Sequence, residues 1–156
     1  MTQEREKRIK MFNEIDVDKS GFIEYNEFEE YFFKYFNLND ENSQVEKRRI
    51  FKLIFSLCDK KPFLKEKDNR IDKKEFKRIY EALQKIKGER CKKSIGQFLY
   101  HVIDKNENGV ITKNEMRKVT ELLKLTEEVL DVFFDELDLN KDGNIDWEEF
   151  SNWYDE

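Results

Sequence analysis

The sequence has few of the residues that interrupt helices or cross-link small folds. Its 156 residues include one proline, five glycines, two cysteines, one histidine and three methionines. Cys58 and Cys91 lie far apart in the sequence and form no zinc or redox motif, so we expect two reduced thiols, as in a cytoplasmic protein. No apolar run approaches the roughly 20 residues of a membrane span. The first residues are too charged for a secretory signal.

Sequence signatures of catalysis are also missing. The single histidine, His101, has no cysteine or carboxylate cluster at zinc-ligand spacing, and we expect it on a helix surface. The sequence contains no nucleophile elbow and no phosphate-binding loop. We therefore expect no enzyme activity, no catalytic residues and no organic cofactor.

Charged residues are abundant, but the two signs nearly balance. Lys, Arg, Asp and Glu make up 42% of the chain, and the net charge is −5. The 30 Lys and Arg residues are dispersed along the sequence instead of forming one block. This mixture is typical of a solvated helical surface, and it argues against nucleic acid as a partner.

Three stretches of the chain repeat one pattern of oxygen-bearing residues around a single glycine. They are residues 16–27, 104–115 and 138–149. In each, positions one, three and five carry Asp, Asn or Ser, position six is Gly, position eight is Ile and position twelve is Glu. Short oxygen ligands at alternate positions, a sharp glycine turn and a long final carboxylate suit a hard cation such as calcium. The spacing therefore predicts three calcium loops, and we expect their isoleucines to pair as short ribbons between neighbouring loops.

A further loop, second in chain order, departs from this pattern. Ile71 and Glu75 stand where positions eight and twelve belong, but counting back twelve residues puts Leu64, which has no side-chain oxygen, at position one. A loop that starts at Asp59 is five residues too long. We expect that this loop binds no metal and serves to pair Ile71 with Ile23. The alternative is an expanded site whose ligands would be Asp59, Glu66, Asp68 and Glu75.

Apolar residues recur at helical spacing on both sides of each loop, which predicts eight helices around four loops. We expect Ser43 to cap the third helix, Gly88 to end the fourth, and Thr126 to cap the seventh. The expected fold is all-α, with four helix-loop-helix units in two pairs and short two-stranded ribbons between paired loops. The N-terminal pair would occupy residues 1–88, and the C-terminal pair residues 89–156.

The three loops resemble those of the EF-hand superfamily, which includes calmodulin. The long N-terminal half and the irregular second loop are similar to the arrangement in sarcoplasmic calcium-binding proteins and calerythrin. The resemblance implies calcium as the bound ion, with magnesium as a competitor. It implies side-chain ligands at positions one, three, five, nine and twelve, and a backbone carbonyl at position seven. The implied ligands are Asp16, Asp18, Ser20, Phe22, Glu24 and Glu27; Asp104, Asn106, Asn108, Val110, Thr112 and Glu115; and Asp138, Asn140, Asp142, Asn144, Asp146 and Glu149.

Two roles are compatible with such a protein. A buffer changes little when calcium binds, whereas a sensor opens a hydrophobic groove for a target helix. Sensors of the calmodulin type use methionine-rich grooves, and this chain has three methionines. We therefore expect a cytoplasmic, monomeric calcium buffer or signal modulator that binds three calcium ions. The alternative is a calmodulin-like sensor, whose partner would be the helix of a target protein.

Overall fold

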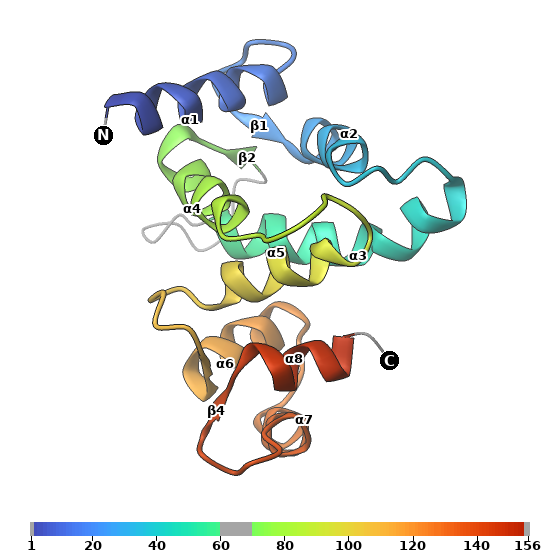
Figure 1. Cartoon of the computed structure of the whole chain (residues 1–156), viewed down its shortest axis with the longest axis vertical. Helices are drawn as coiled ribbons and strands as arrows, with labels where there is room; N and C mark the ends of the chain where they lie inside the picture. Colours follow the sequence, from blue (N-terminus) through green and yellow to red (C-terminus); the bar gives the residue numbers. More distant parts are fainter. Residues whose placement is uncertain (1, 60–69, 155–156) are drawn as a thin grey trace.

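The computed structural model describes residues 2–59 and 70–154 (Figure 1). Within these ranges the chain forms eight helices and four strands of two residues each. In chain order they are α1 (Thr2–Ile15), β1 (Ile23–Glu24), α2 (Tyr25–Tyr35), α3 (Glu41–Cys58), β2 (Arg70–Ile71), α4 (Lys73–Gln84), α5 (Ser94–Ile103), β3 (Ile111–Thr112), α6 (Lys113–Leu122), α7 (Glu127–Leu137), β4 (Asn144–Ile145) and α8 (Trp147–Tyr154). This arrangement confirms the all-α fold that the sequence predicts.

The expected ribbons between loops are present in both halves. Strands β1 and β2 pair antiparallel with Ile23 opposite Ile71, and β3 and β4 pair antiparallel with Ile111 opposite Ile145. All four isoleucine side chains are fully buried. Branched apolar side chains placed opposite each other stabilise such a short pair of strands. Each ribbon therefore joins two loops of one half.

Two of the three expected helix ends are placed differently. Helix α3 begins before Ser43, because Asp40 lies one turn earlier and its carboxylate accepts the Ser43 backbone N–H at 2.6 Å. The predicted cap at Ser43 is therefore wrong. Helix α4 ends at Gln84, and Gly88 lies in the following linker with a φ of +85°, a conformation that favours glycine. Thr126 caps α7 as expected.

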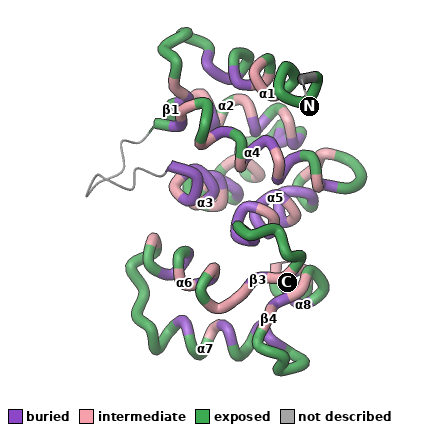
Figure 2. Tube along the Cα trace, turned by 90° about the vertical axis from the view of Figure 1, so that its left-hand side faces the viewer, coloured by how far each residue is buried: buried purple, intermediate pink, exposed green. Residues whose placement is uncertain are grey.

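Phenylalanine rings from both halves pack in a common core. Phe98 of α5 lies with its ring centroid 5.4 Å from that of Phe32 on α2 and 5.7 Å from that of Phe36, the C-cap of α2. Phe51 of α3 packs against the same two rings, at 6.5 and 6.2 Å. All of these side chains are fully buried. Figure 1 shows α5 between the N-terminal helices and helices α6 to α8, and Figure 2 shows buried positions along both α3 and α5.

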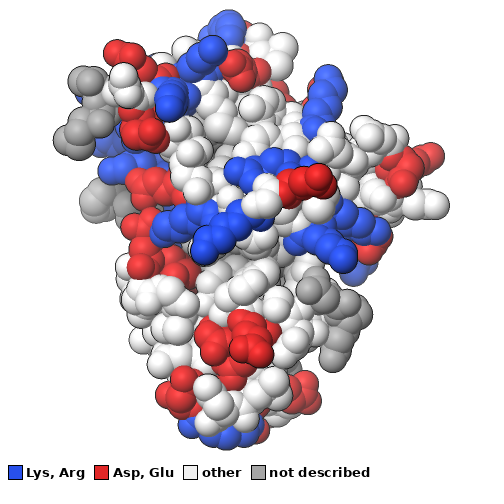
Figure 3. All heavy atoms as spheres, viewed as in Figure 1, with Lys and Arg blue, Asp and Glu red and all other residues white. Residues whose placement is uncertain are grey.

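The surface carries both signs of charge. On the face seen in Figure 3, Lys and Arg gather across the middle of the molecule, with Asp and Glu beside and below them. Cys58 is buried and Cys91 is partly exposed, and no disulfide joins these two cysteines. In the two described ranges, no helix has both the length and the apolar character that crossing a membrane requires.

Candidate metal centres

The three complete loops fold in the same way around their first aspartate. That aspartate directly follows the entering helix and is almost fully buried. One of its oxygens accepts the backbone N–H of the position-six glycine at 2.9 Å in every loop. These glycines have φ angles of +86°, +87° and +83°, a conformation that side chains disfavour. The pairs are Asp16 with Gly21, Asp104 with Gly109, and Asp138 with Gly143.

The position-twelve glutamate closes each loop from the exiting helix. Its Oε2 accepts the backbone N–H of position three at 3.2, 3.1 and 3.1 Å in loops one, three and four. Its Oε1 accepts the backbone N–H of position nine at 3.0, 3.0 and 3.1 Å. Both carboxylate oxygens are therefore turned into the loop, as a ligand that supplies two oxygens requires. The three residues are Glu27, Glu115 and Glu149.

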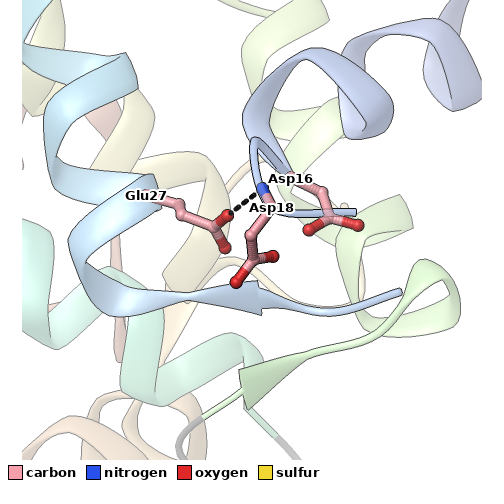
Figure 4. Close-up of side chains that lie close together, drawn as sticks. All are labelled: Asp16, Asp18 and Glu27. Carbon is pink, nitrogen blue, oxygen red and sulfur yellow. Dashed lines mark hydrogen bonds between the residues drawn. The ribbon is translucent and has the colours of Figure 1, made fainter. Parts of the chain in front are cut away.

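Carboxylates converge in loops one and four. Figure 4 shows Asp16, Asp18 and Glu27 turned toward one another in loop one, and one oxygen from each lies within 4.8 Å of the others. A hydrogen bond from the Ser20 side chain lowers the pKa of Asp18 and favours its charged form. Several negative charges at such distances repel one another unless a cation lies among them. The corresponding group in loop four is Asp138, Asp142 and Glu149.

Loop three has fewer carboxylates, but one of them has an unsatisfied oxygen. Asp104 Oδ1 is buried, and none of the described residues donates a hydrogen bond to it. Burial raises the pKa of this carboxyl above its ordinary value. An orphaned buried oxygen is costly unless a donor or a cation satisfies it. The expected ligand atoms of all three loops are oxygens, so these loops fit a calcium ion. The ion would neutralise the negative charge of the carboxylates.

Position nine also caps the exiting helix. Thr112 Oγ1 accepts the backbone N–H of Glu115 at 3.3 Å, and Asp146 Oδ1 accepts that of Glu149 at 2.8 Å. A side chain held in this way contacts a cation more readily through water than directly, as position nine often does. At position seven of loop one, the carbonyl of Phe22 lies close to the loop side chains, because Ser20 Oγ donates to it at 2.9 Å.

The ends of the second loop match those of the other loops. Asp59 follows α3 with φ −81° and ψ 86°, close to the −81° and 79° of Asp138 after α7. Glu75 Oε1 accepts the backbone N–H of Asp72 at 3.0 Å, the bond that position twelve makes to position nine elsewhere. The other residues on which our expectation depends, Leu64, Glu66 and Asp68, lie outside the described residues. That this loop binds no metal therefore stays a prediction.

The sequence pattern did not single out Tyr100, which connects loops three and four. Its hydroxyl lies 2.7 Å from the carbonyl oxygen of Gly109 and 3.3 Å from that of Ile145. The side chain is buried, and burial raises the pKa of its phenol, so the hydroxyl stays a donor at neutral pH. No local signal in the sequence shows that its hydroxyl lies between two loops.

The two tryptophans lie close to loop four. The sequence predicts that ordering of the exiting helix, as expected with calcium, buries Trp153 against Phe133, Phe134 and Phe150 and leaves Trp147 nearer solvent. In the structure Trp153 does contact Phe133 and Phe150, at 5.3 and 5.6 Å between ring centroids, but it is 41% exposed, against 37% for Trp147. The predicted difference in burial is therefore wrong. Helix α8 is short and its outer face has no further element of the described chain packed over it, so Trp153 keeps one side in solvent.

Tryptophan emission should therefore report on loop four. We expect calcium to change the emission, because Glu149 and both tryptophans lie on α8. Trp153→Phe should reduce the change without abolishing it, since Trp147 is equally exposed. In a fluorescence titration of Glu149→Gln, calcium should hardly change the tryptophan emission. In Glu27→Gln, which alters loop one, the calcium-dependent change in emission should remain. A full signal in Glu149→Gln would contradict the assignment to loop four.

Known proteins resemble this chain in its loops. An EF-hand domain pair matches residues 92–155, and a single EF hand domain matches residues 9–35. The 16 kDa calcium-binding protein of Schistosoma mansoni is 35% identical over 54 residues, which are 35% of this chain and 38% of that protein. Calcium-binding protein H of Dictyostelium discoideum is 29% identical over 113 residues, 70% of this chain and 62% of that protein. The chain thus spans less than two thirds of either relative.

Solved structures also resemble the chain. Calcium-loaded apo-aequorin from Aequorea victoria has 20% identity and a TM-score of 0.40, over 97% of this chain and 88% of that one. The calcium-loaded apo form of coelenterazine-binding protein from Renilla muelleri has 23% identity and a TM-score of 0.39, over 97% and 84%. The two EF-hand matches together cover more than half of the chain and include loops one, three and four. The chain therefore belongs to the EF-hand family of calcium-binding proteins.

Proposed function

We propose that the protein is a non-catalytic, monomeric calcium buffer or modulator of the cytoplasm. It holds three calcium ions, one in each of loops one, three and four, through the ligands that the sequence pattern implies. Magnesium competes for the same oxygen ligands. The second loop contributes its strand to the ribbon and takes no ion.

The packing of α5 on α2 is the observation that supports a buffer. A sensor has to expose an apolar groove when calcium binds. Here the apolar face of α5 is already covered, because Phe98 packs on Phe32 and Phe36 from the other half. Opening the C-terminal half along this face would expose rings that are now fully buried. Burying a large aromatic side chain is worth about 2–3 kcal/mol, so the closed arrangement is favoured.

An exposed apolar surface on the C-terminal half favours the alternative, a sensor that binds a target helix. Trp153 and Phe133 line a cavity of about 240 Å³ beside loop four. Large exposed apolar side chains are found in α7 and in the loops around it. They are Leu123, Leu125, Val129, Val132 and Leu139. Surfaces of this kind mark binding sites when they are contiguous.

Dye fluorescence and amide NMR spectra with and without calcium distinguish the two roles. For a buffer, calcium should shift the loop resonances and leave the emission of a hydrophobic dye nearly unchanged. A strong calcium-dependent rise in dye emission would contradict the buffer and support the sensor. Val132→Asp would then show whether the dye binds at α7, with Val45→Asp, a similarly exposed valine on α3 outside the loops, as its control. Titration calorimetry should give three ions, and a fourth would show that the second loop binds calcium.

Loop three should bind calcium most weakly when each loop is tested alone. Only Asp104 and Glu115 are carboxylates among its expected ligands, whereas loops one and four each have four. The number of charged ligands is one of the factors that set the calcium affinity of an EF-hand. We therefore expect loop three to bind calcium about tenfold or more weakly than loop four. Glu27→Gln with Glu149→Gln leaves loop three, and Glu27→Gln with Glu115→Gln leaves loop four. Tighter calcium binding by the first of these variants would contradict the charge argument.

A further inference from the structure

One arginine connects the starts of loop two and loop three, which belong to different halves. Arg78 on α4 donates from Nη1 to the carbonyl oxygen of Leu57 at 3.0 Å, and from Nη2 to the carbonyl oxygen of Val102. Leu57 lies in the last turn of α3, and Val102 in the last turn of α5. Each of these carbonyls belongs to the residue two positions before the first aspartate of its loop, Asp59 or Asp104. Arg78 therefore binds equivalent points in the helices that lead into loops two and three.

The carbonyl of Val102 depends on this side chain for a donor. In a continuing helix it would accept the N–H four residues on, but that N–H, from Asn106, donates to Glu115 Oε2 at 3.1 Å. The last carbonyls of a helix need such a donor, and they carry the negative end of the helix dipole. A guanidinium offers both the positive charge and several donors in a fixed fork. Arg78 thus supplies the donor that the last turn of α5 lacks, and it also donates to the last turn of α3.

The surroundings of Arg78 strengthen the contact. Its side chain is partly buried, and its Nε is buried with no hydrogen-bond partner among the described residues. Electrostatic interactions are stronger where water is excluded. A second cation, Lys85 at the C-terminal cap of the same helix, acts on the rim of loop three, where its Nζ lies 2.7 Å from Glu107 Oε1. Loop three is therefore held from the N-terminal half at two points.

We propose that Arg78 is a positioning residue for calcium in loop three. It holds the last turn of α5 in the orientation that places Asp104 in the loop, and it couples loop three to the end of α3. By reciprocity, calcium in loop three then stabilises the junction between the halves. This inference rests on the proposed binding of calcium by loop three, and it names a residue that contacts no ion itself.

The test combines Arg78→Met with two backgrounds that each leave one loop. The double variant Glu27→Gln/Glu149→Gln leaves only loop three. In this background we expect Arg78→Met to lower calcium affinity about tenfold, because removing a residue that orients a metal ligand has an effect of this size. In Glu115→Gln/Glu149→Gln, which leaves loop one, the affinity should not change. Equal losses in both backgrounds would show a general structural role and overturn the proposal, as would no loss in either.

Arg90→Met is the matched control. Arg90 lies at the same junction and donates to the Tyr35 hydroxyl at 3.0 Å and to the Gly88 carbonyl at 2.8 Å, but to neither loop. It should leave the calcium affinity of loop three unchanged. A loss as large as that of Arg78→Met would overturn the proposal, because it would show that any cation at the junction has this effect.

Amide hydrogen exchange without calcium gives a readout that does not depend on metal. We expect Arg78→Met to speed exchange at Ile103 and Asp104, and Arg90→Met to leave it unchanged. If the background variant takes up no calcium in loop three, the proposed function is wrong for that loop, and unchanged exchange would separately overturn the role of Arg78.

Should Arg78→Met fail to fold, Arg78→Lys keeps the charge but not the forked arrangement of donors. Unchanged exchange and affinity in Arg78→Lys would then overturn the proposal.

Discussion

Replacing Glu149 with glutamine is expected to remove the calcium ion of loop four and to lower the calcium stoichiometry by one. Both oxygens of Glu149 are turned into the loop, where they accept the backbone N–H groups of Asn140 and Asp146. Glutamine has nearly the same shape but loses the charge and one acceptor oxygen. Removing a group that hydrogen-bonds to a metal ligand lowers metal affinity about 10- to 100-fold. Removing the charge of the ligand itself should therefore lower calcium affinity about 100-fold or more. Titration calorimetry measures both the affinity and the number of ions.

Glu148 offers a matched control one residue away. Its side chain is exposed, and Glu148→Gln makes the same chemical change on the same helix. This variant should bind as many ions as the unmodified protein. Glu27→Gln and Glu115→Gln should each remove one ion from their own loops. Full stoichiometry in Glu149→Gln would contradict the assignment of loop four, and an equal loss in Glu148→Gln would show that net charge alone decides binding.

Replacing Phe98 with alanine should destabilise the whole molecule by about 3–5 kcal/mol, the usual cost of removing a buried aromatic side chain. Phe98 is fully buried and packs on Phe32 of α2 and on Phe36 at its C-cap, so the cavity opens in the core that both halves share. Urea unfolding followed by circular dichroism gives this free energy. We expect one cooperative transition, moved to lower urea concentration, because neither half keeps its apolar face covered without the other.

Phe133→Ala removes the same side chain from a half-buried position on α7. Phe133 packs mainly on Trp153, which is itself exposed at the surface. We therefore expect a loss of only about 1–2 kcal/mol. Equal losses in the two variants would contradict the shared core. Two separate transitions, of which Phe98→Ala moves only one, would show that the halves fold independently.

The shape of the three complete loops could be predicted from the sequence, because it is local. Twelve consecutive residues carry the expected ligands, the glycine turn and the closing glutamate, so their spacing decides the geometry without help from distant residues. The isoleucine ribbons followed from the same spacing, and Ile23 does pair with Ile71. The cap of α3 was missed because Asp40 and Ser43 are both good capping residues one turn apart, and local preference does not choose between them.

The relation between the halves was decided only by the tertiary structure. Phe98 has the helical spacing of any core residue, and nothing near it in sequence indicates that its partners are Phe32 and Phe36. The same holds for Arg78, whose carbonyl partners lie 21 and 24 residues away. The exposure of Trp153 depends likewise on which elements happen to cover the end of α8. Ligand spacing is a property of one short segment, whereas packing between helices depends on how the whole chain fills its core. The sequence by itself therefore determined the three complete loops. The contacts that join the two halves were decided only by the tertiary structure.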